Sequence, residues 1–227
     1  MTTRILIFCE GQTEEAFVQK CLLPYFGMLA MELKCCVLRT SLHHKGGLVS
    51  YGQFHGQVKR IMKEDHHLWV TSLIDFYGIP HDFPGYQEAA LLSGAAQKAE
   101  TVESRLAEDL GNRLGESIRR RFIPHVQMHE FEGLLFSEPE KISQYLGDPH
   151  LLASLETIRK NYLTPEDIND SPVTAPGKQL KKLFPGYQKV LHGSTIADLI
   201  GLPTIRRECP LFDAWLTRLE SLEPLEP

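Results

Sequence analysis

Four carboxylates come at or just after apolar runs that the sequence predicts as β-strands: Glu10 after the first run, Asp75 after the third, Glu130 and Glu132 after the fourth. Because the carboxyl ends of parallel strands share one edge of a sheet, we expect these side chains to converge there. Clustered carboxylates raise one another's pKa unless a cation lies among them, and their hard oxygens suit Mg²⁺ or Mn²⁺. Such an ion activates water and stabilises charge at a phosphoryl centre. Any one of these acids alone is equally an ordinary solvated strand-end residue, but together they predict a metal site for phosphoryl chemistry.

Two further side chains are placed to assist such a centre. His129 directly precedes Glu130 and suits a general base or a phosphate contact, although a histidine beside acids is as often a hydrogen-bonded structural residue. The stretch Thr174-Ala175-Pro176-Gly177-Lys178 predicts the start of a helix. It sets Lys178 near the positive helix end, where it would act as a phosphate anchor.

Basic residues that are candidates for holding a phosphate backbone occur in two clusters: Arg119, Arg120, Lys178, Lys181, Lys182 and Lys189. A charge run at helical spacing is equally a solvated helix face, so both interpretations stay open. Binding through such residues would weaken steeply with salt. His43, His44 and Lys45, in a glycine-rich loop, either reach the sheet edge or are simply mobile.

The elements that must position these residues alternate between strand and helix. Apolar runs of strand length lie at 5–9, 33–38, 68–74 and 122–128. Helical spacing of apolar residues lies at 14–30 and 53–65, and 88–114 predicts a helix with one break. Pro24 is expected to kink or end the first helix. The βαβαβ order of the first half predicts a parallel sheet.

Beyond residue 136 the pattern changes to helix-like pieces separated by prolines, without a convincing strand. We therefore predict an α/β domain at 1–136, with a parallel sheet of about four strands flanked by helices. An all-helical C-terminal region at 137–227 is expected to pack against it.

The composition excludes several classes of protein. The chain has 227 residues, of which 42% are hydrophobic and 23% charged, and its net charge of −5 gives no global basic field for nucleic acid. The five cysteines are scattered without a CxxC pair, which predicts reduced core thiols and argues against a structural zinc site. Neither a signal peptide nor a run of membrane-spanning length is recognisable. We expect a soluble, cytoplasmic protein.

Three motifs resemble those of a bacterial family with a Toprim-like core: Glu10-Gly11-Gln12-Thr13-Glu14, Ile74-Asp75-Phe76-Tyr77-Gly78 and His129-Glu130-Phe131-Glu132. The resemblance continues through Ile168-Asn169-Asp170, 174–178, Tyr187-Gln188-Lys189 and Asp213-Ala214-Trp215, and so covers nearly the whole chain. Toprim domains of topoisomerases, primases and overcoming-lysogenization-defect nucleases share a glutamate after the first strand and an Asp-x-Asp after the third, which bind Mg²⁺ for phosphoryl transfer. Glu10 and Asp75 match the glutamate and the first aspartate. Tyr77 stands at the second aspartate, so a metal site would need Glu130 or Glu132 in its place.

The resemblance implies a metal-dependent nuclease acting on DNA or RNA, with Mg²⁺ or Mn²⁺ held by Glu10, Asp75, Glu130 and Glu132. His129 and Lys178 would assist. It also implies the effector of a bacterial anti-phage defence system that works beside an ATPase of the AAA, ABC or SMC kind.

Two alternatives stay open. The first is a catalytically silent Toprim-like adaptor that docks on an ATPase, which Tyr77 and the acidic net charge favour. The second is a small phosphoester hydrolase or nucleotide-binding enzyme that uses the same acids. The sequence leaves the choice between DNA and RNA, the partner and the oligomeric state open.

Overall fold

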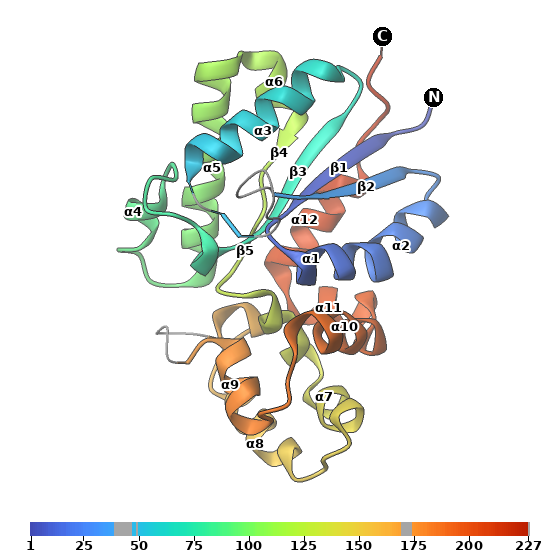
Figure 1. The fold of residues 1–227 in the computed structure, drawn as a ribbon, viewed down its shortest axis with the longest axis vertical. Coiled ribbons are helices and arrows are strands. Elements are labelled where there is room, and N and C mark those ends of the chain that lie inside the picture. Colours follow the sequence, from blue (N-terminus) through green and yellow to red (C-terminus); the bar gives the residue numbers. More distant parts are fainter. Residues whose placement is uncertain (39–46, 49, 169–173, 227) are drawn as a thin grey trace.

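A parallel sheet with helices on both faces forms one half of the molecule, and most of the C-terminal helices lie beyond the carboxyl edge of that sheet (Figure 1). The computed structural model describes residues 1–38, 47–48, 50–168 and 174–226. His43, His44 and Lys45, which the sequence made candidates for reaching the sheet edge, lie outside the described residues.

The sheet has the strand order β2-β1-β3-β4, and β5 continues along β3 beyond β4. Its strands are β1 (Arg4–Cys9), β2 (Glu32–Val37), β3 (Trp69–Asp75), β4 (Phe122–Ile123) and β5 (Val126–Gln127). All neighbouring strands run parallel. The two central strands β1 and β3 are buried along almost their whole length, because helices cover both of their faces. The prediction of an α/β fold with a parallel sheet flanked by helices is confirmed.

The strand predicted at 122–128 is divided into β4 and β5 by Pro124 and His125. Proline has no N–H to donate to a neighbouring strand, so the ladder is interrupted there. The hydroxyl of Ser72 on β3 closes the gap, since it donates to the carbonyl of His125 and accepts from its N–H, both at 3.0 Å. A buried side chain thus replaces two backbone hydrogen bonds that the sheet would otherwise make.

Helical layers cover both faces of the sheet (Figure 1), and alternate side chains of the strands pack into different layers. One layer contains α3 (Tyr51–Glu64), α4 (Tyr86–Ala89), α5 (Ala95–Leu114) and α6 (Glu116–Arg121), and the other contains α1 (Gln12–Phe17), α2 (Leu23–Met28) and α12 (Pro210–Glu220). Phe8 of β1 packs into the first layer, with its ring centroid 6.2 Å from that of Phe54. Its neighbour Ile7 packs into the second layer.

The first predicted helix passes through Pro24 instead of ending there. Between α1 and α2 lies a π-helical turn, Val18–Leu22, in which the N–H of Leu23 donates to the carbonyl of Val18. A π turn is wider than an α turn, and it lies directly before the proline whose ring and missing N–H would disrupt a regular helix. The wider turn is the physical reason why Pro24 does not terminate the element.

Helical segments make up the described part of the chain after β5, as predicted. These are η3 (Phe131–Ser137), α7 (Pro139–Leu146), α8 (Leu151–Lys160), η4 (Pro165–Asp167), α9 (Pro176–Leu183), η5 (Lys189–Gly193), α10 (Ser194–Ile200), α11 (Leu202–Glu208) and α12. Proline occupies the first or second position of α7, α9, α11 and α12, where a missing N–H costs nothing. These four prolines, which suggested separate pieces, therefore mark helix starts.

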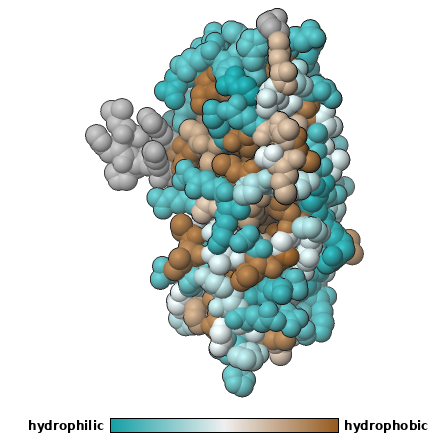
Figure 2. Space-filling view, turned by 90° about the vertical axis from the view of Figure 1, so that its right-hand side faces the viewer, coloured by the Kyte–Doolittle hydropathy of each residue, from teal (hydrophilic) through white to brown (hydrophobic). Residues whose placement is uncertain are grey.

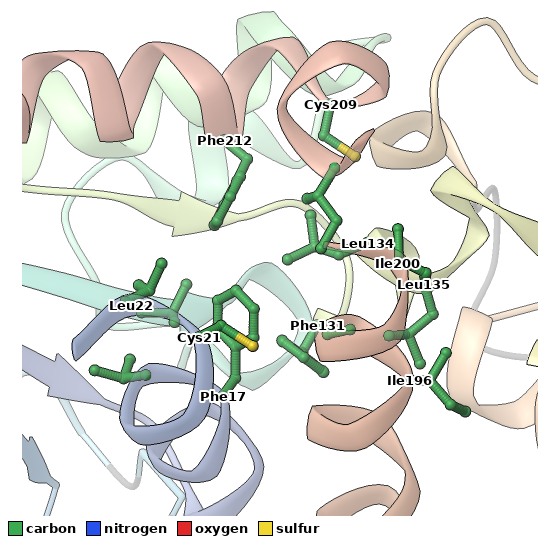
Figure 3. Packing of buried hydrophobic residues seen from close by; sticks show 14 of the residues in the cluster. Phe17, Cys21, Leu22, Phe131, Leu134, Leu135, Ile196, Ile200, Cys209 and Phe212 are labelled. Atoms are coloured by element: carbon green, nitrogen blue, oxygen red, sulfur yellow. The ribbon is translucent and has the colours of Figure 1, made fainter. Parts of the chain in front are cut away.

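A shared apolar cluster joins the C-terminal helices to the sheet (Figure 3). Phe17 of α1 lies at its centre, with its ring centroid 5.1 Å from that of Phe131 and 5.9 Å from that of Phe212 on α12. Glu166 of η4 fixes the start of α12 by accepting hydrogen bonds from the N–H groups of Leu211 and Phe212, at 2.9 and 2.8 Å. The chain on either side of residue 137 thus contributes to one core, and the division into two domains at that residue stays a prediction.

The five cysteines are free thiols, of which Cys9, Cys21 and Cys209 are buried and Cys35 and Cys36 are partly exposed. Within the described chain, no helix combines the length and apolar character needed to cross a bilayer.

Replacing Ser72 by alanine should lower the free energy of unfolding by about 1–3 kcal/mol, because the buried N–H and carbonyl of His125 would both lose a partner. Urea unfolding followed by circular dichroism measures this difference. Ser104→Ala, on the exposed surface of α5, is the control and should change stability by less than about 0.5 kcal/mol. Equal stabilities of the two variants would mean that the hydroxyl of Ser72 does not support the interrupted strand.

Candidate metal centre at the carboxyl edge of the sheet

Glu10 lies at the end of β1 and is held by the neighbouring central strand. Its Oε2 accepts a hydrogen bond of 2.9 Å from the backbone N–H of Asp75, and its own N–H donates to the carbonyl of Leu73. The carboxylate fills the space beside Gly78, where an added Cβ would lie only 2.2 Å from Glu10 Oε1. A glycine at position 78 is therefore required for the carboxylate of Glu10 to turn toward β3.

Glu14 joins the same edge, and the sequence did not predict it. It lies in the first turn of α1 and its Oε2 accepts a 2.8 Å hydrogen bond from the N–H of Gly11, so it also caps the helix. Burial and then the charge of Glu10 raise the pKa of Glu14 to about 7. An acid in a first helical turn is usually a partner of the helix dipole, so nothing in its type or position marks Glu14 as a site residue.

Asp75 ends β3 beside these two glutamates. Burial raises the pKa of its carboxyl well above the usual range, and charges on Glu14, Glu10 and Glu132 raise it further. Its Oδ1 is shielded from solvent and has no hydrogen-bond partner among the described residues. Asp75 thus lies where the predicted metal ligands should meet, with an unused oxygen.

Glu130 and Glu132 approach from the start of η3, and Lys189 of η5 lies between them. The Lys189 ammonium is 2.9 Å from Glu132 Oε2 and 3.2 Å from Glu130 Oε1. Glu130 Oε2 also accepts a 2.9 Å hydrogen bond from the N–H of Gly177 at the start of α9. Glu132 is 1% exposed, and its Oε1 has no partner in the described chain.

Negative charge exceeds positive charge at this edge. Glu10, Glu14, Asp75, Glu130 and Glu132, hereafter the acid cluster, lie close enough for their charges to interact, and among the described residues Lys189 is the ammonium that contacts them. Burial raises the pKa of Glu10 and of Glu132, whereas the nearby charge of Lys189 lowers both. The two glutamates bound to Lys189 raise its pKa despite the opposing effect of burial. One ammonium does not neutralise five carboxylates, so the remaining charge must be met by protons or by a cation.

The donor set fits a small divalent cation. In the part of the chain that the structure describes, no three His, Cys, Asp or Glu side chains are arranged to ligate an ion directly. Mg²⁺, however, is usually held by one or two carboxylates and keeps several waters. The unused oxygens Asp75 Oδ1 and Glu132 Oε1 and the carboxylate of Glu10 are oxygens of the hard type that this ion prefers.

The predicted basic residues divide between the two edges of the sheet. Arg119 and Arg120 precede β4, whose first residue pairs with Val70 near the start of β3, and both contact Glu116. Asp75 is five residues further along β3, which at 3.3 Å per residue is roughly 17 Å away. The structure therefore places these two arginines at the edge opposite to the acid cluster.

The lysines lie nearer to the acids, but in different settings. Lys178, Lys181 and Lys182 are exposed on α9, whose start binds Glu130. Lys178 and Lys182 line a groove of about 510 Å³ between α8 and α9, together with the hydroxyl-bearing residues Ser154, Thr157 and Thr174. Lys189, expected to bind phosphate, instead contacts the acids directly.

His129 and Tyr77 lie together at the rim of the acid cluster. His129 is 5% exposed and adopts a left-handed backbone with φ of 63°, which is uncommon for a residue other than glycine. Its carbonyl accepts a hydrogen bond of 3.2 Å from the N–H of Tyr77. Its ring packs against Tyr77 and Phe76, with centroid distances of 5.5 and 6.3 Å. The histidine thus has little exposed surface with which to meet a substrate.

Comparisons with known proteins identify a family and distant solved structures. A family model described as "Domain of unknown function (DUF4276)" matches residues 9–220. Two solved structures of the C-terminal region of the Xanthomonas campestris pv. campestris OLD protein, phased with iodine and with mercury, are each 15% identical in sequence. Each comparison covers 96% of this chain and 98% of that chain, with TM-scores of 0.40 and 0.39. No curated protein matches this chain.

Without divalent cations, the free energy of unfolding should fall as the pH rises from about 5 to about 8, because the folded chain keeps a proton on Glu14 that the unfolded chain has lost. The raised pKa of Glu14, about 7, sets this window. Glu14→Gln, which keeps the hydrogen bond to Gly11, should flatten the pH dependence, as measured by urea unfolding in EDTA.

The control is Glu166→Gln, because burial also raises the pKa of Glu166 to about 7 at a position outside the acid cluster. Mg²⁺ should remove the part of the pH dependence of stability that Glu14 causes. It should leave the part that Glu166 causes. A slope that neither Glu14→Gln nor Mg²⁺ alters would contradict the assignment of the excess charge to the acid cluster.

Proposed function

This chain belongs to the DUF4276 family, and we propose that it hydrolyses phosphodiester bonds of DNA or RNA with Mg²⁺ or Mn²⁺ bound at the acid cluster. The observation that carries the proposal is the convergence of buried carboxylates from β1, α1, β3 and η3 on one edge, with an excess of negative charge. Burying like charges together is costly unless a cation joins them, so such an arrangement is typical of a metal site.

Glu10, Asp75 and Glu132 are the proposed metal ligands, directly or through water, and Glu14 and Glu130 complete the negative field. The hydrogen bond from the Asp75 N–H fixes the orientation of Glu10 before any ion arrives. When bound, a divalent cation would supply a site that lowers the pKa of water and offsets charge at the phosphoryl group. Lys189 holds Glu130 and Glu132 in place, and its side chain is about one-third exposed.

The groove between α8 and α9 is the proposed path for the phosphate backbone. Its residue Lys178 directly follows Gly177, which contacts both Glu130 and Lys189 at the start of α9, and Lys182 lies in the last turn of the same helix. A backbone lying in this groove would therefore lead to the acid cluster. The lysines of this groove would allow a chain with net charge −5 to hold a polyanion.

The proposal also includes a Toprim-like core and a role as the effector of an anti-phage defence system. It further includes an ATPase partner of the AAA, ABC or SMC kind. They rest on the motifs around Glu10, Asp75 and Glu130 described above, and on the position of the first two at the ends of the central strands.

A catalytically silent adaptor is the second candidate, because Lys189 already neutralises part of the acid cluster and Tyr77 replaces an expected ligand. A docking surface for the ATPase is then required. Figure 2 shows apolar residues along the middle of the face that carries α2 and α11. A groove of about 620 Å³ lies there, lined in part by Pro24, Met28 and Leu202, and Met28 is 79% exposed.

Calorimetric titration with Mn²⁺ should show saturable binding to the wild type and loss of binding in Glu10→Gln and Asp75→Asn. Gly78→Ala should weaken binding at least about tenfold without removing a ligand, because its Cβ would displace the carboxylate of Glu10. The matched control is Gly56→Ala on α3, whose Cβ would meet nothing within 4 Å and which should leave Mn²⁺ binding unchanged.

Absence of Mn²⁺ binding by the wild type would overturn the metal-dependent enzyme and favour the adaptor. If binding is found, cleavage of plasmid, single-stranded DNA and RNA should require Glu10 and Asp75. A preference for mononucleotides over polynucleotides would favour the small phosphoester hydrolase instead.

Lys182→Ala should weaken nucleic-acid binding and reduce the slope of log affinity against log salt by about one, as expected for loss of one phosphate contact. Lys181→Ala is the matched control, because Lys181 is exposed on the same helix but does not line the groove. Fluorescence anisotropy at several salt concentrations, with Ca²⁺ in place of Mg²⁺, measures both slopes. Equal effects of the two substitutions would show that the groove is not the binding path.

A further inference from the structure

An aromatic side chain lies exposed at the rim of the acid cluster. Tyr77 is 36% exposed, whereas the preceding Phe76 is 4% exposed and belongs to the core. The next residue is Gly78, which contacts the carboxylate of Glu10. Tyr77 is thus two residues from Asp75 and one residue from the backbone against which Glu10 lies.

The ring of Tyr77 packs against two other rings. His129 lies at a centroid distance of 5.5 Å with an interplanar angle of 42°, and Phe76 lies at 6.4 Å with an angle of 58°. The hydrogen bond from the Tyr77 N–H to the His129 carbonyl fixes the backbone at this point. A ring supported in this way loses little conformational entropy when a flat ligand stacks on its exposed side.

We infer that Tyr77 is a stacking platform for an unpaired nucleobase, so that the substrate of the acid cluster is single-stranded nucleic acid. Stacking on an aromatic ring tolerates any base, because every base has a π-face. In a duplex the faces of the bases are covered by their neighbours, and a base must be unstacked before it can meet a protein ring. A base seated on Tyr77 brings the adjoining phosphodiester to the side of Glu10 and Asp75.

One nearby cation agrees with this assignment. Lys98 lies over the ring of Phe76, with Nζ 5.8 Å from the centroid, and is placed to meet a phosphate near the stacked base. The inference rests on the proposed function for the identity of the reaction. The stacking itself is measurable without catalysis.

The test compares two oligonucleotides of equal length, one of thymidines and one abasic, by fluorescence anisotropy in Ca²⁺. Tyr77→Ala should weaken binding of the thymidine oligonucleotide by roughly 5- to 150-fold, the range for loss of one base–aromatic stack, and leave the abasic one unchanged. Tyr77→Phe keeps the ring and should bind within about twofold of the wild type. Leu163→Ala removes an apolar side chain that is 88% exposed elsewhere, and is the control.

Several outcomes would overturn the inference: equal losses for both oligonucleotides, no loss in Tyr77→Ala, or tighter binding of a duplex than of the single strand by the wild type. Binding of neither oligonucleotide would overturn it as well. Mn²⁺ binding with hydrolysis of a small activated phosphodiester would then still support the proposed function. Conversely, Tyr77-dependent binding without any Mn²⁺ binding would overturn the proposed hydrolysis and keep the stacking site.

Discussion

Repulsion between buried carboxylates is the constraint on which the rest of the structure depends. Burial weakens the screening of these charges by water, so fixed donors are needed to stabilise the carboxylates. Backbone N–H groups of Gly11, Asp75 and Gly177 supply three of these donors, and Lys189 supplies the ammonium. Because the donors come from β3, α9 and η5 as well as from the turn after β1, the edge forms only when the C-terminal helices are in place.

Part of this arrangement follows from the sequence by simple geometry. Glu10 and Asp75 end buried apolar runs, and a βαβαβ order brings the ends of such runs to one edge. The same rule also places residues that precede a parallel strand at the other edge. Arg119 and Arg120 precede β4, so this rule alone places them at the edge opposite to the acids.

Other features depend on contacts that no local pattern reveals. The ion pairs of Lys189 span 57 and 59 residues of chain, so its sequence suggested a phosphate-binding lysine and gave no sign of these contacts. Glu14 has the same appearance as any acid in a first helical turn, and its burial depends on packing against the far half of the chain. The strand predicted at 122–128 ran through Pro124, and no local pattern indicated that the hydroxyl of Ser72 would bridge an interruption there.

Both termini lie at the end of the sheet away from the acid cluster (Figure 1). The hydroxyl of Thr3 donates a hydrogen bond of 3.2 Å to the carbonyl of Leu222. The indole N–H of Trp69 donates one of 2.8 Å to the carbonyl of Glu223. A fluorophore, affinity handle or fused protein joined at either end would therefore emerge on the side opposite to the carboxylates. Surface-immobilised or fused forms of the chain can thus present the acid cluster and its rim unobstructed to a large polymer.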